Sequence, residues 1–231
     1  MIRKKAFLAI PAAALALIGG CIVSDQLTTI TIRPDGSADW VKFQSNIRST
    51  ETGAKGAQEL KRFIEEFDAR KDSDSQRILE VGGEVLDSRW LRGEEPYANV
   101  AVARFPSASV LQEFFTIRGE KGEPIVEPLF TRCGNLRRFS LTIAVPGNGV
   151  PETGPIPTLQ QARQAQADGI SETRVVVAFG RIVDSQGFTV SADKRSALLD
   201  PVAIHSLLRS GKEEVELFLE WELDWKGAVR P

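Results

Sequence analysis

The sequence contains few of the residues that most catalytic and metal sites need. It has one histidine and two cysteines in 231 residues. His205 and Cys133 cannot supply the three or four ligands of an ordinary zinc site. Serine hydrolysis needs a base beside the nucleophile, and the chain has no Gly-x-Ser-x-Gly elbow. We therefore expect no metal and no cofactor, and we place His205 on the surface or boundary of a helix spanning 201–210.

A strong charge of one sign is also missing. The formal net charge is −2, so the chain as a whole carries no basic surface for nucleic acid. Hydrophobic residues make up 42% of the chain and charged residues 26%, which is typical of a globular protein and excludes general disorder. Only one stretch, near the N-terminus, is apolar enough to enter a bilayer.

That stretch has the three parts of an export signal. The cationic segment Met1–Lys5 precedes an uncharged run, Ala6–Gly20, and Cys21 follows directly. The run is shorter than the roughly 20 residues of a membrane-spanning helix, and Pro11 interrupts it. We predict that residues 1–20 are a signal peptide.

The segment Leu17–Cys21 resembles a bacterial lipobox, with Ile18, Gly19 and Gly20 before the cysteine. The resemblance implies a thioether-linked diacylglycerol on Cys21, cleavage before it, and acylation of the new amine, for example by palmitate. The alternatives are an ordinary signal peptide with a chance cysteine, or an uncleaved anchor. If the lipobox interpretation holds, residues 21–26 form a lipidated tether that holds the protein at a membrane of the cell envelope. That membrane is the outer membrane if the host is Gram-negative, because Ile22 rather than Asp follows the cysteine.

Removal of residues 1–20 takes away three cations and no acids, so the mature charge becomes −5. Cys133 is then the only remaining thiol. We expect a small buried hydrophobic residue there, with a reactive thiol or an intermolecular disulfide as alternatives. A disulfide between Cys21 and Cys133 competes only if the lipobox interpretation is wrong.

The rest of the chain predicts an α+β fold. Hairpins would form an antiparallel curved sheet, packed with a long amphipathic helix over 54–70 and two or three short helices. Pro34-Asp35-Gly36-Ser37 is a typical turn, in which Asp35 accepts local hydrogen bonds. The expected strands cover 27–33, 38–47, 84–90, 97–105, 125–131, 136–145, 174–183, 188–191 and 215–225, and short helices are expected near 107–115 and from Pro201.

Two segments bear on domain organisation. Residues 146–157 contain four prolines and three glycines, and a polar helix is expected over 158–167. We predict a single domain over 27–231, which could divide into two lobes at this break. The run 174–183 is apolar without alternation, which predicts one central strand covered on both faces.

The last strand carries an acidic row formed by Glu216, Glu220, Glu222 and Asp224. Alternate residues of a strand lie about 7 Å apart, which would suit a glycosidase pair or a cation site. The simpler interpretation is a solvated sheet face, paired with arginines on neighbouring strands. A groove could be lined by the four tryptophans, which are Trp40, Trp90, Trp221 and Trp225. Most of them, however, fall at positions expected in the core.

Short motifs resemble those of uncharacterised bacterial envelope lipoproteins, including mycobacterial ones. They are the turn in Gly180–Ser191, the segment Leu219-Glu220-Trp221, and the Pro34–Ser37 hairpin close to Cys21. The resemblance implies a sheet that curls around a helix to bind or move lipids, and no catalytic residues. We expect a non-enzymatic, lipid-anchored envelope protein that binds a lipid, an envelope component or a protein partner. The alternative is an envelope hydrolase that uses the acids of the last strand.

Overall fold

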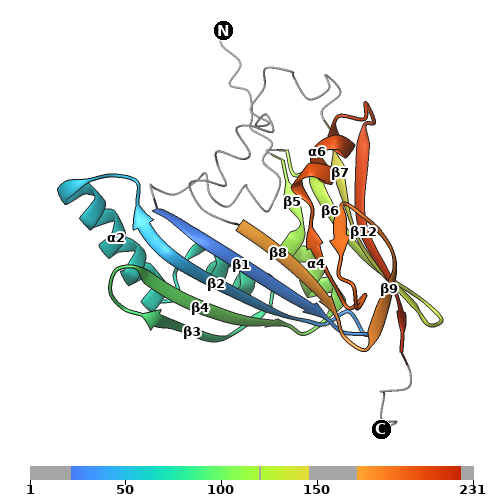
Figure 1. Cartoon of the computed structure of the whole chain (residues 1–231), viewed down its shortest axis with the longest axis horizontal. Coiled ribbons are helices and arrows are strands. Elements are labelled where there is room, and N and C mark those ends of the chain that lie inside the picture. Colours follow the sequence, from blue (N-terminus) through green and yellow to red (C-terminus); the bar gives the residue numbers. More distant parts are fainter. Residues whose placement is uncertain (1–21, 120, 146–170, 225–231) are drawn as a thin grey trace.

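The computed structural model describes residues 22–119, 121–145 and 171–224, which form two β-sheets with helices packed against them. Within this part of the chain, the larger sheet has seven strands in the order β10-β11-β8-β1-β2-β4-β3. The smaller sheet has five, in the order β5-β6-β7-β12-β9. Figure 1 shows the sheets standing at an angle to each other, with α4 between them.

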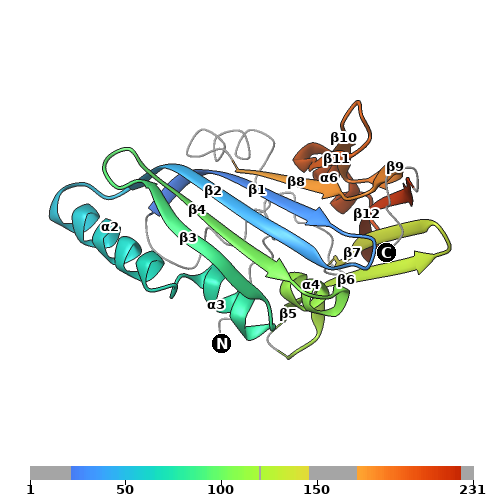
Figure 2. The same ribbon diagram turned by 90° about the horizontal axis from the view of Figure 1, so that it is seen from below.

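The strands of the larger sheet are β1 (Ile22–Ile32), β2 (Ala38–Ser49), β3 (Glu84–Arg92), β4 (Tyr97–Phe105), β8 (Ser171–Val177), β10 (Phe188–Val190) and β11 (Ser196–Leu199). The strands of the smaller sheet are β5 (Ile117–Arg118), β6 (Pro124–Cys133), β7 (Leu136–Ala144), β9 (Gly180–Gln186) and β12 (Glu214–Leu223). The described helices are α2 (Gly53–Asp68), α3 (Ser73–Glu80), α4 (Ala108–Phe115) and α6 (Pro201–Leu208). Figure 2 shows α2, α3 and α4 along one face of the larger sheet.

The predicted α+β class is confirmed. Among the described strand pairs, all are antiparallel except β1 with β8. Both sheets take strands from before and after residues 146–170. The break at 146–157 and the helix at 158–167 lie outside the described residues.

The first hairpin forms at the predicted turn. Gly36 has a φ of +87°, a left-handed value that a side chain would strain. A Cβ atom there would lie 2.5 Å from the Cβ of Ala108 and 2.8 Å from the ring of Phe130. The turn therefore requires glycine at this position for two reasons, the backbone angle and the close packing against α4 and β6.

The strand predicted over 174–183 is wrong. The chain leaves the larger sheet after Val177 and enters the smaller sheet at Gly180, so that β8 and β9 belong to different sheets. Phe179, at the corner, has a φ of +58°. The run is rich in apolar residues because both of its strands contribute to the core that the sheets share, through Val177 and Ile182.

The polar residues 72–75, which the sequence predicts as a loop after the long helix, do not form one. These residues begin α3, and the Asp72 carboxylate accepts a hydrogen bond of 3.0 Å from the backbone N–H of Ser75. An N-cap of this kind satisfies a donor that the first helical turn leaves open. The short α3 is stabilised by packing, since Ile78 is buried in the main core.

The tether expected at 21–26 is shorter than predicted. β1 already begins at Ile22, which pairs with Ser49 of β2. Cys21 and the signal peptide predicted over 1–20 lie outside the described residues. If the chain is cleaved before Cys21, a single residue separates the new N-terminus from the folded sheet.

The main core lies where the two sheets approach each other. It contains Ile30, Ile32, Trp40 and Phe105 from the larger sheet, Phe139, Leu219 and Trp221 from the smaller sheet, and Leu111 from α4. A second cluster packs α6 against the smaller sheet through Ile204 and Leu208. The predicted alternation of the last strand is confirmed, because Val215, Leu217, Leu219, Trp221 and Leu223 are all buried.

Candidate functional site

The acidic row of β12 lies on the solvent face of the smaller sheet, as its alternation predicts. Glu216 and Glu220 are half-buried and Glu222 is exposed. Asp224 follows the end of the strand, and its backbone N–H donates to the carbonyl oxygen of Phe179 over 2.8 Å. Among the described residues, these acids form no group arranged to hold a metal ion.

Arg138 on β7 engages two of these acids. Its guanidinium nitrogens lie 2.8 Å from a carboxylate oxygen of Glu216 and 3.4 Å from one of Glu220. The guanidinium carbon also lies 3.7 Å from the ring centroid of Phe218, between the two glutamates along the strand. The arginine occupies the space that a water or a sugar would need between catalytic carboxylates. This is the ion pairing expected of a solvated sheet face.

Cys133 corrects the expectation of a buried residue, because it is exposed at the end of β6. The strand ends there at a tight turn, so no layer covers the side chain. His205 is half-buried on α6, consistent with the boundary position predicted for it. The local role of Asp35 is also observed, since its carboxylate accepts hydrogen bonds from the hydroxyl and the backbone N–H of Ser37 over 2.7 and 3.0 Å. Burial raises the pKa of Asp35, but these hydrogen bonds outweigh it and hold the pKa below its usual value.

The tryptophans do not line one common groove. Trp40 and Trp221 are buried in the main core. Trp90 is half-buried at the opposite end of the larger sheet, against α2. Trp225 lies outside the described residues.

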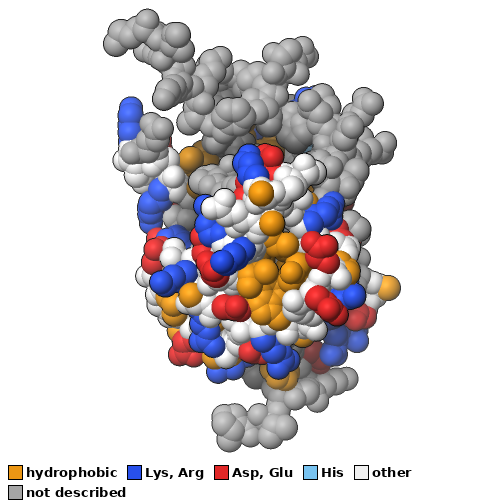
Figure 3. All heavy atoms as spheres, turned by 90° about the vertical axis from the view of Figure 1, so that its left-hand side faces the viewer, with side chains coloured by type: hydrophobic (Ala, Val, Ile, Leu, Met, Phe, Trp, Pro, Cys, Tyr) orange, Lys and Arg blue, Asp and Glu red, His pale blue; other side chains and the backbone are white. Residues whose placement is uncertain are grey.

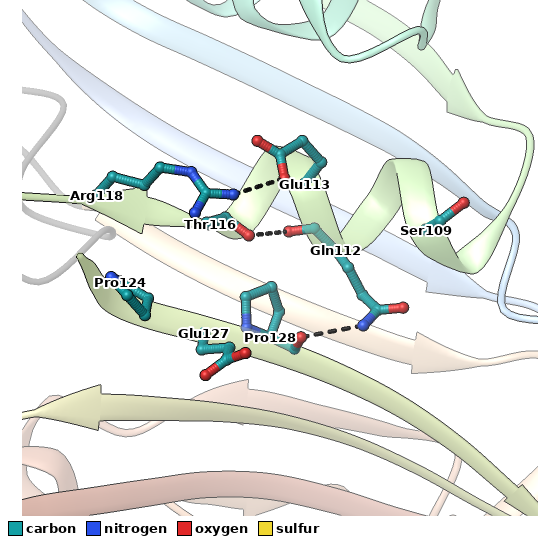
Figure 4. A pocket seen from close by; sticks show the side chains of 8 residues that line it. All are labelled: Ser109, Gln112, Glu113, Thr116, Arg118, Pro124, Glu127 and Pro128. Carbon is teal, nitrogen blue, oxygen red and sulfur yellow. Dashed lines mark hydrogen bonds and ion pairs between the residues drawn. The ribbon is translucent and has the colours of Figure 1, made fainter. Parts of the chain in front are cut away.

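A pocket of about 270 Å³ lies between α4 and β6 (Figure 4). Several of its polar groups already pair with one another. The Gln112 side chain donates to the carbonyl oxygen of Pro128 over 3.1 Å, and Arg118 pairs with Glu113 over 3.3 Å. The pocket thus lacks the convergent polar groups that would hold a ligand.

The most distinctive surface is the inner face of the larger sheet, which we define as the face that carries Ile32 and Trp40. Strand register divides it into rows that run across the strands. The two rows nearest the smaller sheet are apolar: Val177, Ile32, Ala38 and Phe105, followed by Val175, Ile30, Trp40, Ala103 and Val85.

The next two rows on this face change in character, and we call them the polar rows. They are formed by Thr173, Thr28, Lys42, Ala101 and Ser88, and then by Ser171, Gln26, Gln44, Asn99 and Trp90. Ser171 is exposed, whereas Gln44 and Asn99 are buried, and buried polar side chains usually form hydrogen bonds. The inner face is therefore amphipathic along the strands, apolar at one end and polar at the other.

Some polar side chains of the inner face bind one another, including Ser24, which precedes Gln26 on the same face of β1. Ser24 Oγ accepts hydrogen bonds from Gln26 Nε2 over 3.2 Å and from Gln44 Nε2 over 3.1 Å. Asn99 is only 1% exposed, and within the described part of the chain its Nδ2 group has no hydrogen-bond partner. The same holds for the Ser88 hydroxyl. The polar rows thus contain buried donors with unused capacity, which is costly unless another group satisfies them.

Sequence reasoning missed these rows, although a signal was present. In β1 the alternate residues Ser24, Gln26, Thr28, Ile30 and Ile32 change from polar to apolar along one face. The strand was expected from its composition, but the meaning of this gradient depends on the partners that each residue meets across β2, β4 and β8.

Over the described ranges, no group of histidine, cysteine and acidic side chains is arranged to hold a metal ion. Among the same residues, no helix has the length and apolar content required to cross a bilayer.

The chain matches no protein-family model and no curated protein sequence. Among solved structures, it is similar to the NMR structure of the folded domain of the LppM protein of Mycobacterium tuberculosis. That domain is 12% identical, with a TM-score of 0.39, over 96% of this chain and 95% of that chain. At this level of similarity, nothing about function passes from that domain to this chain.

Proposed function

We propose that this protein is a lipid-anchored, non-enzymatic component of the cell envelope that binds an amphiphile on the inner face of its larger sheet. The anchor rests on the lipobox Leu17–Cys21. The binding role rests on the change from apolar to polar rows along that face. An amphiphile has the same division: its head group would take hydrogen bonds from the polar rows, and its chains would enter between the sheets, because the apolar rows are packed in the main core.

The single observation that carries the binding proposal is the unpaired polar capacity next to the apolar rows. The amide of Asn99 is buried without a described partner, and Gln26 and Thr28 are half-buried beside the apolar core. A head group that accepted hydrogen bonds from this region would offset the cost of burying these donors.

The anchor is tested by replacing Cys21 with Ala in the full chain. We expect the wild-type protein in the membrane fraction with an acyl mass on its N-terminal residue, and the variant in the soluble fraction. A variant that stays membrane-bound, or a wild-type protein without the acyl mass, would contradict the anchor.

Binding is tested on purified protein with palmitoyl-lysophosphatidylglycerol as the probe, by native mass spectrometry and titration. Neighbouring residues provide a matched pair, because Thr28 faces the polar rows whereas Thr29 faces the opposite side of the same strand. Thr28→Val should weaken binding several-fold, while Thr29→Val should bind as the wild type does. Equal effects of the two substitutions, or no saturable binding by the wild type, would refute the site.

A further inference from the structure

We propose that the end of the larger sheet at which β1 begins lies against the membrane that holds the lipid of Cys21. The contact surface is the aromatic end, which we define as Phe63 of α2, Trp90 and Leu91 of β3, and Tyr97 of β4. This inference rests on the proposed function, because it uses the lipid anchor to place the protein beside the bilayer.

The aromatic end is a cluster of rings from three elements. The Trp90 ring centroid lies 6.3 Å from that of Phe63, 5.0 Å from that of Phe67 and 5.9 Å from that of Tyr97, all in edge-to-face geometry. The indole N–H of Trp90 donates to a carboxylate oxygen of Asp68 over 2.7 Å. These contacts hold the rings in place, so the surface is preformed.

This cluster is only partly covered. Phe67 is buried, but Phe63, Trp90 and Tyr97 are half-buried. Leu91, the next residue after Trp90 along β3, is 52% exposed. Figure 3 views the molecule from the side that carries α2 and shows hydrophobic side chains gathered there, with charges of both signs around them. Mixed charges give no strong repulsion from an anionic lipid surface, although the mature domain is acidic overall.

Strand register places this surface close to the anchor. Ile22, the first residue of β1, pairs with Ser49 of β2, and Ile47 of β2 pairs with Tyr97. Ile22 and Tyr97 are thus separated by two strand spacings, about 10 Å, and by two residues along the strands, about 7 Å. Cys21 precedes Ile22 directly, and consecutive Cα atoms are about 3.8 Å apart. A lipid on Cys21 would therefore hold this end of the sheet within a short distance of the head groups.

The chemistry of the aromatic end suits a lipid–water boundary. Tryptophan and tyrosine are enriched at such boundaries, because each ring has a large apolar surface and one polar group. With so short a connection, the domain has little freedom to turn this end away from the bilayer. A lipid surface is thus the occupant that both the position and the composition of the patch favour.

The test uses the full lipidated chain in vesicles of phosphatidylcholine and phosphatidylglycerol. In a Cys133→Ser background, Leu91→Cys and Leu129→Cys are each labelled with an environment-sensitive fluorophore. Leu129 is a matched control, since it is 51% exposed and lies on β6 of the other sheet. We expect spin-labelled lipids to quench the label at position 91 several-fold more than the label at position 129.

Equal quenching at the two positions would overturn the proposed orientation. So would a label at position 91 that responds only to protein concentration and not to lipid, because the patch would then bind a protein or a second copy. Flotation with the vesicles reports separately on the anchor. A chain that floats without selective quenching contradicts the orientation alone, whereas a chain that does not float contradicts the proposed function as well.

Discussion

Lys42 of β2 and Asp74 of α3 form an ion pair in which the lysine Nζ lies 2.6 Å from a carboxylate oxygen. Both side chains are largely buried, with exposed fractions of 13% and 12%. Lys42 belongs to the polar rows, so this pair fixes α3 over the inner face of the larger sheet. The pair is thus an ionic contact between a helix and that face.

Breaking this pair should destabilise the protein strongly, because it leaves one charge buried without its partner. We expect Asp74→Ala to lower the free energy of unfolding by about 3 kcal/mol in urea titrations. The double variant Lys42→Met/Asp74→Ala should lose less than the sum of the two single changes. The exposed pair Lys61–Glu65 on α2 is the control, and Glu65→Ala should have little effect. A loss for Asp74→Ala no larger than that for Glu65→Ala would contradict this expectation.

The stabilising contacts of Arg138 should require its planar guanidinium group. It contacts Glu216 and Glu220 and also stacks on Phe218, which one ammonium group cannot do at once. Arg138→Ala should reduce stability by roughly 1–2 kcal/mol, and Arg138→Lys should recover little of this loss. Thermal unfolding of the three proteins is the measurement. Wild-type stability in the lysine variant would show that charge alone is sufficient.

Asp200 should contribute to stability in a pH-dependent way. Its carboxylate caps α6 by accepting hydrogen bonds from the backbone N–H groups of Ala203 and Val202, and it also binds the Thr189 hydroxyl. The Ala203 hydrogen bond, together with those from Thr189 and Val202, outweighs the effect of burial, which raises the pKa, and lowers the pKa of Asp200 in the folded state. The contribution is therefore complete above the unfolded-state pKa and is lost as the pH falls through the folded-state pKa.

Two substitutions separate the capping role from the charge of Asp200. Asp200→Ala should cost about 1 kcal/mol at neutral pH, because the first turn of α6 loses its acceptor. Asp200→Asn should keep most of the cap at neutral pH and show a weaker loss of stability in acid than the wild type. Urea titrations at neutral and acidic pH measure both effects. An unchanged acid dependence in the asparagine variant would contradict the assigned role of the charge.

Cys133 should react in the folded protein. Because its side chain is exposed, we expect a hydrophilic maleimide to modify it without denaturant, at a rate close to that of an unfolded control. Cys133→Ser should abolish this modification and leave the free energy of unfolding almost unchanged. Modification that requires denaturant would contradict the exposed position.

The elements that follow from local sequence were predicted well. Every second residue of β12 is apolar, and the residues between them are acidic except for Phe218, so the buried face of the strand could be read directly. Asp200-Pro201 carries the signals of a helix start, and α6 begins there. In each case the deciding interactions lie within a few residues of one another.

The failures arise where distant parts of the chain decide the outcome. Val175 and Ile182 look like parts of one strand because both are apolar, but they lie on strands of different sheets and pack into the same core. The corner at Phe179 between them has no local signal. Asp72 caps a helix that is stabilised mainly by the burial of Ile78. The polar rows depend on strand register, which places Asn99 opposite Gln44. No local sequence pattern reveals this register.

The parallel pairing of β1 with β8 has a consequence for the order in which the protein can fold. Ile32 pairs with Val177, so the first strand of the domain meets a partner from the last third of the chain. Until that partner arrives, one edge of β1 offers unpaired backbone groups to any other strand nearby. Such long-range closure is slow. A chain that is exported and acylated first would therefore complete its larger sheet while already held at the membrane.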